Sequence, residues 1–71
     1  MNKRKLQAKI IEHGDTQGDL AGALGMSLSN FSLRINGKIE FRRSEIEMIK
    51  HRYNLNPVEL NDIFFEDVVS E

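Results

Sequence analysis

Side chains that could recognise a nucleic acid gather in the middle of this chain. Asn30 carries an amide that can pair with the N6 and N7 edge of adenine, and Ser29 offers a hydroxyl for base edges. Basic residues follow closely, as expected where phosphates are contacted, although a solvated charged loop has the same composition. The chemistry on offer is hydrogen bonding and charge pairing. The basic residues are Lys38, Arg42 and Arg43.

Two short helices joined by a tight turn must position these side chains. In the segment 16–37, TQGDLAGALGMSLSNFSLRING, Leu20 and Leu24 lie one helical turn apart, and the small Ala21 lets a second helix approach closely. Gly25 permits a left-handed corner that another residue would strain by about 1–2 kcal/mol. The pattern predicts a helix-turn-helix, whose second helix can lie in the major groove of duplex DNA.

The faces of the second of these helices follow from its period. At about 100° per residue, Phe31 and Ile35 form the buried side of a helix that Ser27 caps and Gly37 ends. Leu28 lies at an angle that suits either core packing or contact with a groove. The outward face consists of Ser29, Asn30, Leu33 and Asn36, with Arg34 near its edge.

The framework resembles the lambda-repressor-like family of bacterial and phage regulators, which are small all-helical domains. Later residues resemble the small phage repressors of Gram-positive bacteria within that family, and the likeness covers about residues 5–65. The matching residues are Thr16-Gln17, Asp19-Leu20-Ala21, Leu24-Gly25-Met26-Ser27, Ile35-Asn36-Gly37-Lys38, Phe41, Ser44-Glu45-Ile46 and Ile63-Phe64-Phe65.

The resemblance implies which residues would contact DNA. In the family, the residue before the third helix and that helix's first exposed residues meet bases and phosphates, and residues after the helix contact the DNA backbone. Gln17, at the start of the second helix, faces phosphate or the groove. The expected set is Gln17, Ser27, Leu28, Ser29, Asn30, Leu33, Arg34, Asn36, Lys38, Arg42 and Arg43.

Three of these positions depart from the family pattern. Leu28 and Leu33 stand where Gln, Arg or Lys often reads a base, so apolar contact with thymine methyl groups would replace two polar readers. Leu33 could equally be a tolerated surface leucine. Arg34 stands where an apolar residue is usual, and we expect Ile35 to take the core role while the Arg34 guanidinium reaches a phosphate.

The whole chain reads as five helices without a strand, an all-α fold in which helices 2 and 3 form the helix-turn-helix. Leu6, Ile10 and Ile11 give the first helix an apolar stripe, and Phe41 should anchor the loop before the fourth helix. We expect Gly22 to be tolerated inside the second helix. The helices span about 2–13, from the capping box Thr16-x-x-Asp19, Ser27 to about Asn36, from the box Ser44-x-x-Glu47 to about Tyr53, and from Asn56-Pro57-x-Glu59 to about Phe65.

Length and composition bound the function independently. With 71 residues the chain forms one domain, expected over residues 1–66 with a tail over 67–71. There is no cysteine, and His13 and His51 are too far apart for a local metal motif, so no metal or cofactor is expected. No segment is apolar enough for a signal peptide or a membrane span, which favours a cytoplasmic location and no membrane partner.

The net charge is −1, but the basic and acidic residues are unevenly distributed along the chain. A fold that separates the two signs would present a basic face to a polyanion and an acidic face away from it. The basic residues are Lys3, Arg4, Lys5 and Lys9 at the start and Arg34, Lys38, Arg42 and Arg43 after the turn, and the acidic ones are Glu59, Asp62, Glu66, Asp67 and Glu71 at the end.

The sequence therefore predicts a sequence-specific transcriptional regulator that binds double-stranded DNA and acts by occupying an operator. Because one domain makes few base contacts, we expect a symmetric homodimer. Phe65, Val68 and Val69 leave apolar surface beyond what Ile63 and Phe64 need for the core, so the fifth helix is the expected interface.

A second class of function is compatible with the same residues. The helix-turn-helix could serve as a protein-interaction module, for oligomerisation or as an antirepressor, with weak DNA binding; exposed leucines at 28 and 33 and the negative net charge favour it. A third class, single-stranded RNA binding, needs exposed aromatic side chains that stack bases, and the sequence does not indicate such side chains. No nucleophile elbow, phosphate loop or framed carboxylate pair indicates an enzyme or a small-molecule substrate.

Overall fold

The computed structural model describes residues 1–65, and this part of the chain contains six helical segments. This part contains no strand, which confirms the all-α expectation. None of its helices is long and apolar enough to cross a membrane. The segments are α1 (Lys3–Glu12), α2 (Gln17–Ala23), α3 (Leu28–Ile35), α4 (Arg43–Tyr53), α5 (Pro57–Leu60) and a π-helix, η1 (Asn61–Phe65), that continues α5 directly.

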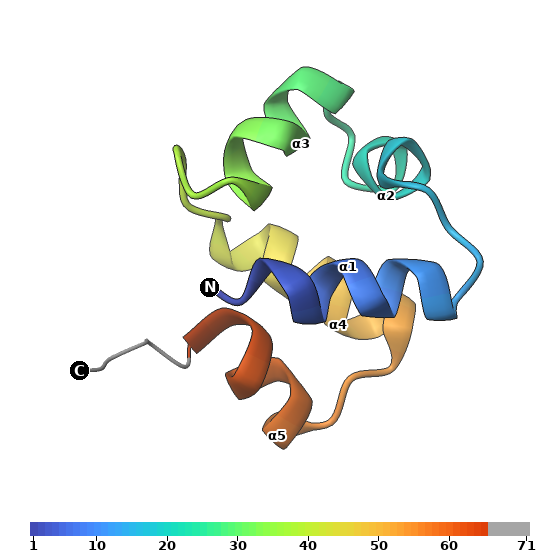
Figure 1. Cartoon of the computed structure of the whole chain (residues 1–71), viewed down its shortest axis with the longest axis vertical. Helices are drawn as coiled ribbons and strands as arrows, with labels where there is room; N and C mark the ends of the chain where they lie inside the picture. The colour runs from blue at the N-terminus through green and yellow to red at the C-terminus, as the bar shows by residue number, and fades with distance from the viewer. Residues whose placement is uncertain (66–71) are drawn as a thin grey trace.

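The helices form three levels along the long axis of the molecule (Figure 1). α2 and α3 lie at one end and pack on each other. α1 and α4 occupy the middle, and α5 with η1 lies at the opposite end, where η1 contacts α1. α1 and α4 thus lie between the α2–α3 pair and the segments α5 and η1.

Local hydrogen bonds set two helix starts as the sequence predicts. Thr16 Oγ1 accepts from the Asp19 N–H at 3.0 Å, and Asp19 Oδ2 accepts from the Thr16 N–H at 2.9 Å. Asn56 and Glu59 make the same reciprocal pair at 2.8 and 3.0 Å, with Pro57 as the first helical residue. Each box satisfies two N–H groups that an uncapped helix start would leave unpaired.

The predicted start of the fourth helix is wrong. α4 begins at Arg43, and Ser44 already lies inside it. The Arg42 N–H donates to Glu45 Oε1 at 2.9 Å, so Glu45 takes the place that the sequence analysis gave to Glu47. The reason is tertiary, because the same Glu45 oxygen also receives a hydrogen bond from Arg34 of α3.

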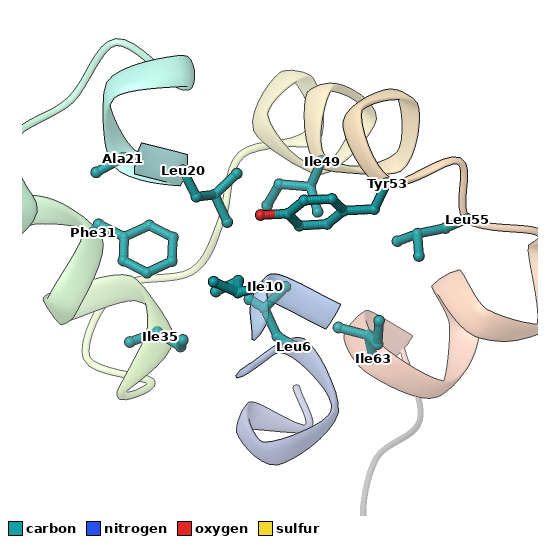
Figure 2. Packing of buried hydrophobic residues seen from close by; sticks show 10 residues of the cluster. All are labelled: Leu6, Ile10, Leu20, Ala21, Phe31, Ile35, Ile49, Tyr53, Leu55 and Ile63. Atoms are coloured by element: carbon teal, nitrogen blue, oxygen red, sulfur yellow. The ribbon is translucent and has the colours of Figure 1, made fainter. Parts of the chain in front are cut away.

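A single apolar core joins all the levels (Figure 2). Phe41 is half-buried and makes edge contacts with Phe31, at 5.9 Å between ring centroids, and with Phe64, at 5.7 Å, so it anchors the loop between α3 and α4 as predicted. The buried apolar residues are Leu6, Ile10, Leu20, Ala21, Phe31, Ile35, Ile49, Tyr53, Leu55 and Ile63.

Ile11 on α1 and Gly22 on α2 both face away from the core. Ile11 was expected on the buried stripe of α1 but is 75% exposed, because one residue past Ile10 the helix has turned by about 100° away from the core. A Cβ at Gly22 would have no heavy atom within 4 Å, so no neighbouring backbone requires glycine there and tolerance is confirmed.

Asp15 ties the loop between α1 and α2 to the end of α4. Its Oδ2 accepts from Arg52 Nε at 2.8 Å and from the Tyr53 hydroxyl at 2.7 Å, and its Oδ1 accepts from Arg52 Nη2 at 3.0 Å. His13 stacks on the Tyr53 ring at 4.7 Å between centroids. Hydrogen bonds from Arg52 and then from Tyr53 lower the pKa of Asp15, and burial raises the pKa of the Tyr53 phenol, which stays a donor.

This cluster predicts a pH-dependent stability. Because the pKa of Asp15 in the folded protein lies below its ordinary 3.8, the carboxylate stabilises the fold above that value, and the contribution is lost as the pH falls through the folded pKa. Asp15→Asn should therefore unfold at lower urea than the wild type at about pH 7, and the difference should shrink towards about pH 2.

Urea unfolding followed by circular dichroism at several pH values measures this difference. Asp62→Asn is the matched control, because Asp62 Oδ2 lies 3.7 Å from Lys5 Nζ in an exposed pair that should contribute little at any pH. Equal stability of Asp15→Asn and wild type at neutral pH, or a difference that does not change with pH, would show that the cluster does not act in this way.

Candidate functional site

The turn between α2 and α3 is built by the backbone of Gly25 and Met26. Gly25 has a φ of +74°, in the left-handed region that side-chain-bearing residues rarely adopt. Its N–H donates to the Gly22 carbonyl at 3.0 Å, and the Met26 N–H donates to the Ala21 carbonyl at 3.0 Å. These bonds close the end of α2 and redirect the chain into α3, as the predicted left-handed corner requires.

α3 begins at a side-chain cap and buries one face only. Ser27 Oγ accepts from the Asn30 N–H at 3.1 Å. Phe31 and Ile35 are buried, as the helical period predicts. The cap therefore fixes the first turn of α3, and the core side chains fix the rotation of the helix about its axis.

The opposite face of α3 is open. Leu28 is 54% exposed and Leu33 is 41% exposed, and the side chains of Ser29 and Asn30 are exposed as well. The core-packing alternative for Leu28 is wrong, because the first residue of the helix lies beyond the edge of the core. Ser29, Asn30 and Leu33 thus share the accessible face of α3, and Leu28 is exposed at the start of the helix.

Arg34 is bound within the protein by groups of α3 and α4. Its Nε donates to Glu45 Oε1 at 3.0 Å, and both side chains are only 12% exposed. Its Nη1 donates to the Asn30 carbonyl at 3.2 Å. The guanidinium thus joins α3 to α4 through the Glu45 carboxylate.

The segment after α3 presents polar and basic side chains. Asn36 Nδ2 donates to the Ser32 carbonyl at 2.9 Å and to Ser32 Oγ at 3.2 Å, which holds the amide against the end of α3. Gly37, with a φ of +80°, ends the helix, and the Lys38 N–H donates to the Leu33 carbonyl at 2.9 Å. The exposed basic side chains here are Lys38, Arg42 and Arg43.

Gln17 belongs to α2 and not to α3 or the segment after it. It is the first residue of α2 and is partly buried, and with Asp15, Thr16 and Ile10 it lines a shallow hollow between α1 and α2. The start of α2 carries the acidic Asp19 in its capping box. Gln17 thus offers a neutral amide at a helix start.

The two signs of charge are not separated onto opposite faces. Lys9 Nζ lies 2.7 Å from Glu59 Oε2, and Lys5 pairs with Asp62, so the acidic end of the chain neutralises much of α1. The hydrogen bond from Lys9, followed by one from the Asn56 backbone, lowers the pKa of Glu59. The expected acidic face is therefore wrong for these residues, because η1 packs on α1; Glu66, Asp67 and Glu71 lie outside the described residues.

Apolar surface remains around the end of η1. Phe65 is 59% exposed and Ile39 is 42% exposed, and both line a shallow hollow with Met1, Ile46 and Phe64. Val68 and Val69, which were expected to extend this surface, lie outside the described residues. Within residues 1–65, no three His, Cys, Asp or Glu side chains gather closely enough to hold a metal ion.

The fold brings one further basic residue to the end of α3. Lys3, in the first turn of α1, donates from Nζ to Asn36 Oδ1, across 33 residues of sequence. Nothing in the local pattern distinguishes Lys3 from its basic neighbours Arg4 and Lys5. Only the packing of α1 beside the end of α3 identifies it.

Comparison with known proteins identifies a family. No curated protein sequence matches this chain. Residues 1–67 match the sequence profile of a family described as "Protein of unknown function (DUF739)". Because the match extends over nearly all of the 71 residues, the chain belongs to the DUF739 family.

Proposed function

We propose that α2 and α3 form a helix-turn-helix. We also propose that the protein is a transcriptional regulator that binds double-stranded DNA sequence-specifically. The observation that most supports this proposal is that α3 has one buried face and one exposed face. Phe31 and Ile35 hold the helix to the core, while Ser29, Asn30 and Leu33 remain exposed along its other side. A rigidly held helix with hydrogen-bonding side chains outward is what readout in the major groove needs.

The proposed contacts divide into base readout and phosphate positioning. Asn30 would pair with an adenine edge, Ser29 would hydrogen-bond to bases, and the exposed Leu28 and Leu33 would meet thymine methyl groups. Ser27, Gln17 and Asn36 would lie against the sugar-phosphate backbone. The cations for phosphates would be Lys38, Arg42 and Arg43.

Arg34 takes a different part in this proposal from the one its sequence position favours. The ion pair with Glu45 holds α3 against the start of α4. It would therefore preserve the angle at which α3 enters the groove, and the phosphate contacts would fall to the exposed cations after Gly37.

The regulator would act by binding alone. A homodimer on a pseudo-palindromic operator, with half-site centres about 34 Å apart, would occlude the polymerase. Phe65, at the end of η1, and Ile39, in the segment between α3 and α4, are exposed and supply the apolar surface that we propose for the dimer contact.

A protein-interaction module is the second candidate, and a specific observation favours it. Leu28 and Leu33 are the most exposed apolar residues of α3 and stand on the face that would meet DNA. An apolar face would also suit a partner protein, with DNA binding weak.

Selection from a random pool of duplexes, followed by salt titration, distinguishes the DNA-binding regulator from the protein-interaction module. If Lys38, Arg42 and Arg43 each neutralise one phosphate, these three contacts should contribute about −2.7 per protomer to the slope of log affinity against log salt. The enriched sites should be symmetric, with the half-site spacing of a dimer. No enriched duplex and no salt-sensitive binding would favour the interaction module.

A further inference from the structure

We propose that Lys3, at the start of α1, contributes a phosphate contact to the DNA surface that α3 and the segment after it form. The inference rests on the proposed function and extends its surface to a third element, α1. Its basis is the hydrogen bond from Lys3 Nζ to Asn36 Oδ1, which brings the ammonium group to the end of α3.

Two hydrogen bonds of the neighbouring Asn2 fix the position of Lys3. The Asn2 N–H donates to the Ile63 carbonyl at 2.6 Å, and Asn2 Oδ1 caps α1 by accepting from the Lys5 N–H at 3.1 Å. Lys3 therefore projects from an anchored first turn of helix. Less side-chain and backbone freedom is lost on binding when a cation is held in place beforehand.

The partner of Lys3 leaves its charge uncompensated. Lys5 and Lys9 face the carboxylates of Asp62, at 3.7 Å, and Glu59, at 2.7 Å. Among residues 1–65, Lys3 has no carboxylate within the 4.0 Å of an ion pair, and its bound partner is the neutral amide of Asn36. Of these three lysines on α1, Lys3 is the one whose full positive charge is presented to a ligand.

The geometry at Asn36 directs that charge to the end of α3. Asn36 Nδ2 is held by Ser32, so Oδ1 points to Lys3, and Lys38 follows two residues later. An ammonium group has three N–H donors, of which Asn36 uses one. Two donors remain for a phosphate oxygen that lies against the same helix end.

The test compares lysines of the same helix in the full chain. Salt titrations of duplex binding are made for the wild type, Lys3→Gln, Lys3→Arg and the control Lys5→Gln, with random-sequence duplex as the probe. Lys3→Gln should reduce the salt slope by about 0.9 per bound protomer and weaken binding about eightfold at 0.1 M salt, with little effect near 1 M. Lys3→Arg and Lys5→Gln should behave as the wild type.

Three results would overturn the inference. The first is an unchanged slope for Lys3→Gln, and the second is an equal loss for Lys5→Gln, which would reflect net charge alone. The third is weaker binding at an unchanged slope, which would mean that Lys3 only holds Asn36 in place. Each differs from failure of the proposed function, in which the wild type itself shows no salt-sensitive binding to duplex DNA.

Discussion

Replacing Phe31 by alanine should leave about half of the protein unfolded at 25 °C. Phe31 is fully buried between the helices, and its ring contacts Phe41, which in turn contacts Phe64. Removing a buried phenylalanine ring costs about 3–5 kcal/mol. A single core of this size supplies only about 3–5 kcal/mol of net stability, so the loss is as large as the whole free energy of unfolding.

Circular dichroism in increasing urea measures this effect. Leu33→Ala is the matched control, since it shortens an apolar side chain two residues away on the same helix but on the exposed face. It should keep the helical signal and shift the midpoint only slightly, because exposed positions change stability by about 0.5 kcal/mol or less. A cooperative transition of Phe31→Ala near the wild-type midpoint would show that the core does not depend on this ring.

Asn30→Ala should relax base preference at one or two operator positions, at a cost of about 1–3 kcal/mol if the amide makes a bidentate contact. Lys38→Ala should instead weaken binding to all sequences alike and reduce the salt slope by about 1. The physical reason is position. Asn30 lies on the outward face of α3 near its start, whereas Lys38 follows Gly37 and would meet charge without sequence.

Operator selections with both variants provide the measurement. The backbone N–H of Asn30, which donates to Ser27 Oγ, survives the substitution, so the cap of α3 is unaffected and a change in preference reports the side chain. An Asn30→Ala profile with unchanged base preference, together with altered preference for Lys38→Ala, would reverse the two assigned roles.

The features that sequence could predict here are those set within a few residues. The capping boxes at Thr16 and Asn56 and the buried pair Phe31 and Ile35 depend on spacings of three or four positions. A periodic pattern and a capping residue specify such features directly, whatever the rest of the fold does. The same reasoning identified Phe41 as a loop anchor, since a lone aromatic residue in a polar loop has few other ways to leave water.

The features that could not be predicted from the sequence depend on partners far away along the chain. Glu45 displaces Glu47 at the start of α4 because Arg34 is its partner across 11 residues, and Asp15 meets Arg52 across 37. Local spacing also left Lys3 indistinguishable from Lys5, although the fold gives one a neutral partner and the other a carboxylate. In the candidate site, helical period therefore predicts exposure, whereas only tertiary packing decides which charges are already compensated.

One oxygen atom closes the connection between α3 and α4. Glu45 Oε1 accepts from the Arg34 side chain at the end of α3 and from the Arg42 N–H at the start of α4, so both ends of the intervening loop share a single acceptor. Displacement of the Glu45 carboxylate would remove a hydrogen bond from each end at once. It follows that the last turn of α3 and the first turn of α4 open together, and their amide protons would exchange with solvent as one cooperative unit.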